Sequence, residues 1–277
     1  MSGRGLAMML ALAAVLGGTG VAQAQEQSQD TAAAPPPPPT DHAADAVFDP
    51  QAMARARAAL VHENGGMAVS QVMIDQLEAR GGGDYAWEGK GWWGGDIDRL
   101  ALESRGEGAF AGRVERAEVQ AGWLHALDPW FNLRAGVRQD LGRGVLGTGQ
   151  RRTHAALTIE GLAPYWFDVE ASLFLSTRGE LTGRAEASYD QRITQRVVVQ
   201  PRVEMEWAAQ AMPDLGTGAG INRIESGLRL RYEIRRNLAP YLGLGWERSL
   251  GGSARAVRAT GERASAVRAL AGVRLWW

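Results

Sequence analysis

Apolar and polar residues alternate along most of the chain from Gly94 to the C-terminus. In residues 131–140, for example, Phe131, Leu133 and Val137 share one parity, while Asn132 and Arg134 share the other. A period of two is the repeat of a β-strand, whose successive side chains point to opposite faces. The pattern predicts ten strands of roughly ten residues each, a length that crosses a membrane at a tilt. Their centres lie near Leu100, Val119, Ala135, Leu157, Leu173, Ala185, Val203, Leu230, Leu244 and Val273.

This alternation suits a soluble β-sandwich with one wet face as well as a membrane barrel. The polar faces favour the barrel, because they carry charges of both signs, as a closed lumen of paired side chains would. The connections are short near residues 128–129, 163–164, 191–192 and 237–238, and long at 142–150, 210–220 and 251–263. Short periplasmic turns alternating with long external loops are typical of outer-membrane barrels.

Aromatic residues gather at the predicted strand ends, where a barrel meets the membrane interface. They are Trp123, Trp130, Tyr165, Trp166 and Tyr241. The last strand, residues 270–277, ends on an aromatic residue, with Gly272, Leu275 and Trp277 in the pattern that the outer-membrane assembly machinery reads. We therefore expect an all-β fold, a closed antiparallel transmembrane barrel of about ten strands, with outer-membrane lipid and the assembly machinery as partners.

The N-terminal third divides into three segments before the barrel. Residues 1–24 have the sparse charge, apolar stretch and small residues of a secretory signal, with cleavage predicted near Ala24. Residues 25–47 form an Ala- and Pro-rich linker that contains five consecutive prolines, Pro35 to Pro39. Residues 48–93 are predicted to be helical: Asp49 and Pro50 suit a helix start, and a second apolar repeat runs from Val69 to Leu77. We expect this segment to lie in the periplasm or plug the barrel, which would then occupy residues 94–277.

Composition narrows the class of protein further. The chain has no Cys, so disulfides, zinc–thiolate sites and Cys nucleophiles are excluded. A formal net charge of −1 argues against a nucleic-acid partner. The mean hydropathy of −0.23, without any run of eighteen apolar residues, excludes a polytopic helical membrane protein. Gly (36 residues) and Trp (10 residues) are abundant, which is unusual for a soluble enzyme.

Motifs for enzymatic chemistry are not found in the sequence. His154 precedes two alanines and so lacks a lipase His-x-Ser pattern, and no His-Glu-x-x-His spacing occurs. Carboxylate pairs such as Glu204 and Glu206 lie at strand spacing, and charges matched by lumenal arginines account for them better than acid–base catalysis does. We therefore predict that the protein is not an enzyme.

Six stretches resemble the copper-resistance protein B family of Gram-negative outer membranes. In order along the chain they are residues 65–73 (GGMAVSQVM), 93–100 (WGGDIDRL), 161–167 (GLAPYWF), 227–235 (GLRLRYEIR), 239–246 (APYLGLGW) and 271–276 (AGVRLW). The resemblance runs from about Asp45 to the C-terminus. It implies an outer-membrane barrel that helps cells to survive excess copper, by binding copper or assisting its export or exclusion, together with periplasmic copper-handling proteins. The alternative is a narrow barrel with a scaffold or general pore role and no specific metal binding.

Family members typically carry a Met- and His-rich region between signal and barrel, and thioether and imidazole groups suit copper. Here that region is Ala- and Pro-rich, with His42 as its one histidine. Any copper ligands must come from a small set: Met53, His62, Met67, Met73 and His154. Met53 and Met73 also suit apolar packing in a pair of helices, and His154 suits a hydrogen-bonded position on a lumenal face. Met205 alternates with Val203 and Trp207 and is expected to face lipid.

Arginines recur on the polar parity of the predicted strands. The simpler interpretation is structural pairing with lumenal glutamates, and the sharper one is a filter or docking surface for an anion or partner. The arginines concerned are Arg99, Arg134, Arg138, Arg202, Arg229, Arg231 and Arg274, and the glutamates are Glu118, Glu170, Glu186, Glu204 and Glu233.

Overall fold

The computed structural model describes residues 42–64, 67–112, 114–141 and 151–277. The predicted signal and most of the predicted linker lie outside these residues, as does the core of the long connection at 142–150. The described residues fall into two units that divide between Ala56 and Arg57.

A short helical segment precedes the barrel in the sequence. It comprises the 3-10 turn η1 (Ala43–Ala46) and the helix α2 (Pro50–Asn64). Asp49 caps α2, because its Oδ2 accepts a hydrogen bond from the Ala52 amide at 3.0 Å, and Pro50 takes the first helical position. These contacts confirm the predicted start of the helix. Among the described residues, no helix has the length and apolar character needed to cross a bilayer.

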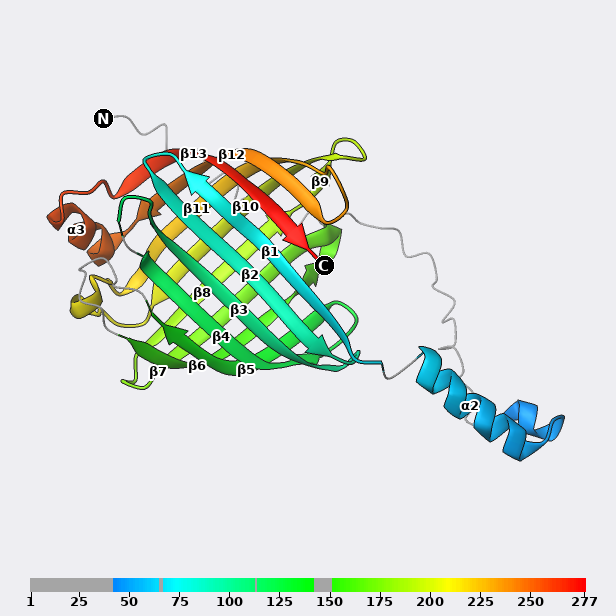
Figure 1. The fold of residues 1–277 in the computed structure, drawn as a ribbon. Coiled ribbons are helices and arrows are strands. Elements are labelled where there is room, and N and C mark those ends of the chain that lie inside the picture. Colours follow the sequence, from blue (N-terminus) through cyan, green and yellow to red (C-terminus); the bar gives the residue numbers. More distant parts are fainter. Residues whose placement is uncertain (1–41, 65–66, 113, 142–150) are drawn as a thin grey trace, which may run out of the picture. The chain divides into compact units, whose positions relative to one another are not determined.

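Antiparallel strands pair in sequence order around a closed ring (Figure 1). Each long strand hydrogen-bonds to the next, β10 pairs with β11, and β13 pairs with β1 to close the barrel. In the described chain the strands are β1 (Val69–Arg80), β2 (Asp84–Gly94), β3 (Asp98–Ala109), β4 (Val114–Ala126), β5 (Phe131–Asp140), β6 (Arg152–Ala163), β7 (Phe167–Ser176), β8 (Leu181–Tyr189), β9 (Gln191–Arg192), β10 (Val197–Ala208), β11 (Gly220–Tyr232), β12 (Leu238–Ser249) and β13 (Ser265–Trp276). The two-residue β9 directly follows β8, so the described barrel has twelve long strands.

The ten predicted strands all exist, and the predicted count was wrong because two more precede them. The segment from Val69 to Gly94, predicted to be helical, forms β1 and β2, so the barrel begins at Val69. A register shift after Ile74 breaks the alternation of β1, which gives its apolar residues a spacing that mimics a helix. In β2, the two outward-facing positions between Trp87 and Trp93 are occupied by Gly89 and Gly91. The sequence therefore lacks the apolar side chains that would have revealed the alternation of a strand.

The barrel is apolar outside and charged inside. Aliphatic side chains such as Leu102, Leu244 and Val267 are more than half exposed on the outer face. Among the buried residues, by contrast, are Glu78, Glu103, Arg134 and Arg229. This inversion of the usual soluble pattern is that of a membrane barrel, whose outer face meets hydrocarbon.

The two ends of the barrel differ, as the sequence predicted. One end carries short connections, including the 3-10 turn η2 (Pro164–Trp166), and the start of β1 and the end of β13 lie there too. We call it the turn end. The loop end carries the connection of residues 209–219, with the 3-10 turn η3 (Pro213–Leu215), and the helix α3 (Gly251–Ala259). These two loop-end connections touch, because Ser253 Oγ accepts a hydrogen bond from the Gly218 amide at 2.9 Å.

Four of the five predicted interfacial aromatics are exposed: Trp123, Trp130, Tyr165 and Trp166. Tyr241 was predicted wrongly. It is 5% exposed and lies in the lumen, where its hydroxyl donates to Glu78 Oε2 at 3.1 Å. Leu242 and Leu244 both face lipid, so strand alternation from these two residues could have predicted that Tyr241 points inward.

Candidate functional site in the barrel lumen

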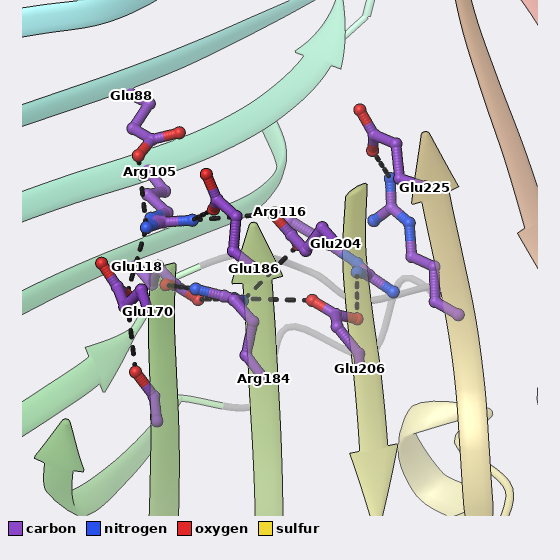
Figure 2. A network of polar contacts seen from close by, with 12 residues as sticks. Glu88, Arg105, Arg116, Glu118, Glu170, Arg184, Glu186, Glu204, Glu206 and Glu225 are labelled. Carbon is purple, nitrogen blue, oxygen red and sulfur yellow. Dashed lines mark hydrogen bonds and ion pairs between the residues drawn. The ribbon is translucent and has the colours of Figure 1, made fainter. Parts of the chain in front are cut away.

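The lumen is crossed by a network of ion pairs between strands that are distant in the ring (Figure 2). Arginines supply almost all of its cations, with Lys90 as the exception, and glutamates supply most of its anions. We call this network the lumenal lattice. Its central members are Glu88, Lys90, Glu103, Arg105, Glu118, Arg134, Glu170, Arg184, Glu186, Arg202, Glu204 and Glu206.

Arg105 on β3 is the hub of the lattice. Its Nη2 lies 3.2 Å from Glu88 on β2 and 3.3 Å from Glu170 on β7, and its Nη1 lies 3.0 Å from Glu186 on β8. Its Nη1 is also 3.6 Å from Glu204 on β10, and its Nε donates to Glu103 on its own strand. One guanidinium therefore ties together walls that the backbone ladder does not connect.

Two further arginines extend these cross-links. Arg184 on β8 makes a two-pronged contact with Glu118 on β4, with N–O distances of 2.6 and 2.9 Å. Arg202 on β10 reaches Glu88 on β2 at 2.8 Å and Glu186 on β8 at 2.7 Å. Paired guanidinium and carboxylate groups have the planar, directional fit that compensates their loss of water.

A second cluster lies at the loop end, where Arg152 holds the 209–219 connection. The Arg152 side chain is 2% exposed and donates to Glu180 in the β7–β8 turn and to Asp214 in η3. Its Nη1 also lies 3.4 Å from the sulfur of Met212. The 209–219 connection is thereby attached to the inner wall of the barrel.

Together these contacts run across the lumen. The lattice links β2 to β10, β4 to β8 and β3 to β7, and the side chains of Glu88, Glu103 and Arg105 are each at most 9% exposed. Barrels of about eight strands are just filled by their side chains, and in this wider one long charged residues reach across the interior. Chemically, the lumen offers fixed charges that are already paired with one another.

Six of the seven predicted arginines form ion pairs, and three of them, Arg134, Arg138 and Arg202, pair with the predicted glutamates. The other three pair with carboxylates that were not predicted: Arg229 with Glu78, Arg231 with Asp190 and Arg274 with Asp75. Arg99 instead donates to the backbone oxygens of Gly95 and Asp96 and stacks on Trp92. Glu233 pairs with the partly exposed Arg192 at the turn end.

Sequence reasoning missed two central arginines of the lattice, Arg105 and Arg184, and also Arg152 of the loop-end cluster. Arg105 and Arg184 have glycine neighbours, Gly106 and Gly183, where an apolar residue would mark the outer face. Large rings cover these glycines, since a Cβ on Gly106 would meet Trp87 at 2.1 Å and one on Gly183 would meet Trp207 at 2.4 Å. The only sequence signal that could have found these two arginines is their odd or even position relative to other residues of the same strand, because the adjacent glycines do not mark the outer face.

The five predicted copper ligands lie on α2, just before β1, and on the barrel strands β1 and β6. Met53 and His62 lie on α2, and Met67 is an exposed residue before β1. Met73 lies on β1 instead of a helix, on the lumenal parity, with its sulfur 3.3 Å from Arg274 Nη2. His154 is buried on β6 with Nε2 3.0 Å from Asp140 Oδ2, as expected for a hydrogen-bonded lumenal histidine. Within the residues described, no three His, Asp or Glu side chains are grouped to hold a metal ion.

Comparison with known proteins gives the same relationship over the whole barrel. The family pattern described as "Copper resistance protein B precursor (CopB)" matches residues 68–277. A copper resistance protein B homolog of Pseudomonas syringae pv. tomato is 41% identical over 211 residues, which cover 75% of this chain and 70% of that protein. Copper resistance protein B of Escherichia coli is 40% identical over 209 residues, 74% of this chain and 69% of that protein.

Two of the solved structures that resemble the chain are porins. The NanC porin is 13% identical, with a TM-score of 0.47, and the match covers 75% of this chain and 99% of that one. The KdgM porin is 14% identical, with a TM-score of 0.43, and the match covers 74% and 98%.

Proposed function

The chain belongs to the copper resistance protein B family, and from that membership we propose that it acts in the outer membrane to protect the cell from excess copper. Copper ion is the species it handles. The turn end faces the periplasm and the loop end faces outward, in keeping with the usual asymmetry of such barrels. The assembly machinery recognises the last strand through Gly272, Leu275 and Trp277.

The observation that carries the proposal is the lumenal lattice of ion pairs across the barrel. A general diffusion pore needs an open, water-lined passage, whereas here the central arginines and glutamates span the barrel and neutralise each other. This arrangement favours a restricted role in copper exclusion or binding over the alternative of a general pore.

A growth assay tests the role in resistance. A strain of the host from which the gene is deleted should become more sensitive to copper, and the full chain supplied in trans should restore growth. The same strains grown with zinc and nickel control for general envelope damage. Unchanged growth of the deletion strain across the copper series would contradict the proposal.

Conductance measurements in planar lipid bilayers distinguish the proposed function from the alternative of a general pore. The refolded mature protein should give little steady current, because the lattice occupies the lumen. A large, non-selective conductance in the wild-type protein would instead support the general pore.

Copper binding is tested separately, by calorimetric titration of the refolded mature chain with Cu(I). The test variant replaces Met53, Met67 and Met73 with Leu, and His62 and His154 with Gln. The matched control is Met205→Leu, because Met205 shares its parity with the exposed Val203 on the outer face. Equal binding by wild type and test variant would exclude these five residues as ligands, while leaving the resistance role to the growth assay.

A further inference from the structure

Three arginines at the loop end stand apart from the lumenal lattice. Arg248 at the end of β12, Arg258 on α3 and Arg263 after α3 are all exposed. Across residues 42–64, 67–112, 114–141 and 151–277, none of the three has an ion pair or a side-chain hydrogen bond, whereas the lumenal arginines are multiply paired. Three unneutralised guanidinium groups therefore gather at one point of the rim.

Arg248 lies on the outer, lipid-facing surface. On β12 the same face carries Leu242 and Leu244, both at least 60% exposed, and then Trp246. Trp246 Nε1 donates to Ser265 Oγ on β13 at 3.1 Å, and Ser265 is the register partner of Arg248. Going toward the loop end, the surface changes from aliphatic to aromatic to cationic.

This order matches the depth profile of a bilayer. From Leu244 to Arg248 the strand rises about 13 Å, or about 10 Å along the membrane normal at the usual tilt. Trp marks the interface, and a residue beyond it reaches the headgroup layer, which is about 5–7 Å thick on each side. Arg248 thus lies at the height of lipid headgroups and on the side that meets them.

An open hollow of about 440 Å³ lies at this point, lined by Arg248, Arg258, Glu262, Arg263, Ala264 and Ser265. Glu262 is its one carboxylate, so the lining keeps an excess of positive charge. α3 packs on the barrel at the loop end through the buried Ala254 and Val257 (Figure 1). Arg258 on α3 and Arg248 at the end of β12 line the same hollow. The hollow is therefore a fixed cationic recess next to an apolar wall.

We propose that this recess binds the phosphate group of a lipid headgroup in the outer leaflet, with Arg248, Arg258 and Arg263 as its ligands. Guanidinium groups match phosphate oxygens in charge and in their paired hydrogen-bond geometry. The recess continues into the aliphatic face of Leu244 and Val267, where acyl chains of the same lipid can lie. That continuity favours a lipid over free phosphate. The assignment to the outer leaflet rests on the orientation given under the proposed function, but the binding chemistry does not.

Native mass spectrometry of the refolded full chain tests the site with diphosphoryl lipid A as the probe. The test variant is Arg248→Gln/Arg258→Gln/Arg263→Gln. Its matched control is Arg196→Gln/Arg235→Gln/Arg236→Gln, which removes three exposed arginines without ion pairs from the turn end. The heat-induced gel shift of the folded barrel confirms that each variant folds, and Arg248→Gln alone serves if the triple variant does not fold.

Wild type and control should retain one bound lipid A, and the test variant should bind it about ten- to a hundredfold more weakly, because charge-assisted contacts are lost. Monophosphoryl lipid A should bind wild type more weakly than the diphosphoryl form. Equal lipid A binding by test and control variants would overturn the proposal. Stabilisation of wild type by inorganic phosphate, without lipid A binding, would also overturn it and indicate a free-anion site. Because the assay contains no copper, its failure leaves the proposed resistance role intact.

Discussion

Replacing the hub of the lumenal lattice should destabilise the whole barrel. In Arg105→Gln, five glutamates lose a cation that lies within 4.0 Å of each of them: Glu88, Glu103, Glu170, Glu186 and Glu204. Each keeps at least one other cation: Arg134 contacts Glu103 and Arg202 contacts Glu186. Glu88, Glu170 and Glu204 each keep two, Arg202 and Lys90 for Glu88, Lys90 and Arg134 for Glu170, and Arg202 and Arg184 for Glu204. The variant therefore buries one uncompensated negative charge.

The expected cost is about 3 kcal/mol in the free energy of unfolding, the lower end of the range for breaking a buried ion pair, because the remaining cations share the excess charge. Removing one carboxylate as well should restore part of this loss. Glu204→Gln is the suitable second change, because its contacts with Arg105, Arg184 and Arg202 are all 3.3 Å or longer. The double variant should recover about half of the loss.

Urea unfolding of the refolded protein in lipid vesicles, followed by Trp fluorescence, measures these differences. Arg192→Gln is the matched control, since its side chain is 57% exposed and pairs with Glu233, so its cost should stay below about 1 kcal/mol. If Arg105→Gln costs no more than Arg192→Gln, or the double variant is no more stable than the single one, the lumenal charges are not coupled as described.

Four further outcomes are expected. Gly272→Ala should lower the free energy of unfolding by about 1–3 kcal/mol in the same assay, because a Cβ there would lie 2.6 Å from the Tyr241 hydroxyl and 2.7 Å from a backbone oxygen. Tyr241→Phe should lower it by only about 1 kcal/mol, because it removes one hydrogen bond to Glu78. Arg152→Gln should speed cleavage of the 209–219 connection by thermolysin, and an unchanged rate would contradict its role as an anchor. Asp49→Ala should weaken α2 by about 1 kcal/mol, measured as lost helical circular dichroism in the full chain, because the Ala52 amide loses its cap.

Local pattern was sufficient where lipid-facing apolar and lumenal polar side chains alternated without a break along the strand. Strands β3 to β8 and β10 to β13 were predicted because hydrocarbon demands an apolar side chain at every second position. The start of α2 was readable for the same local reason, since capping by Asp49 depends on residues close in sequence. The arginines on the lumenal parity could be predicted to pair, because charges in a closed lumen must be compensated.

Partners and exceptions were decided by tertiary structure. The shift after Ile74 follows from pairing β1 with both β2 and β13, which no local pattern reports, and it concealed two strands. Strand pairing brings Tyr241 against Gly272, a residue 31 positions later in the chain, on the neighbouring strand. Arg105 is a hub because closure brings β2, β7, β8 and β10 around one guanidinium. Alternation specifies which face a side chain takes, whereas the ring specifies what it meets, because contacts across a lumen join residues with no fixed spacing in the sequence.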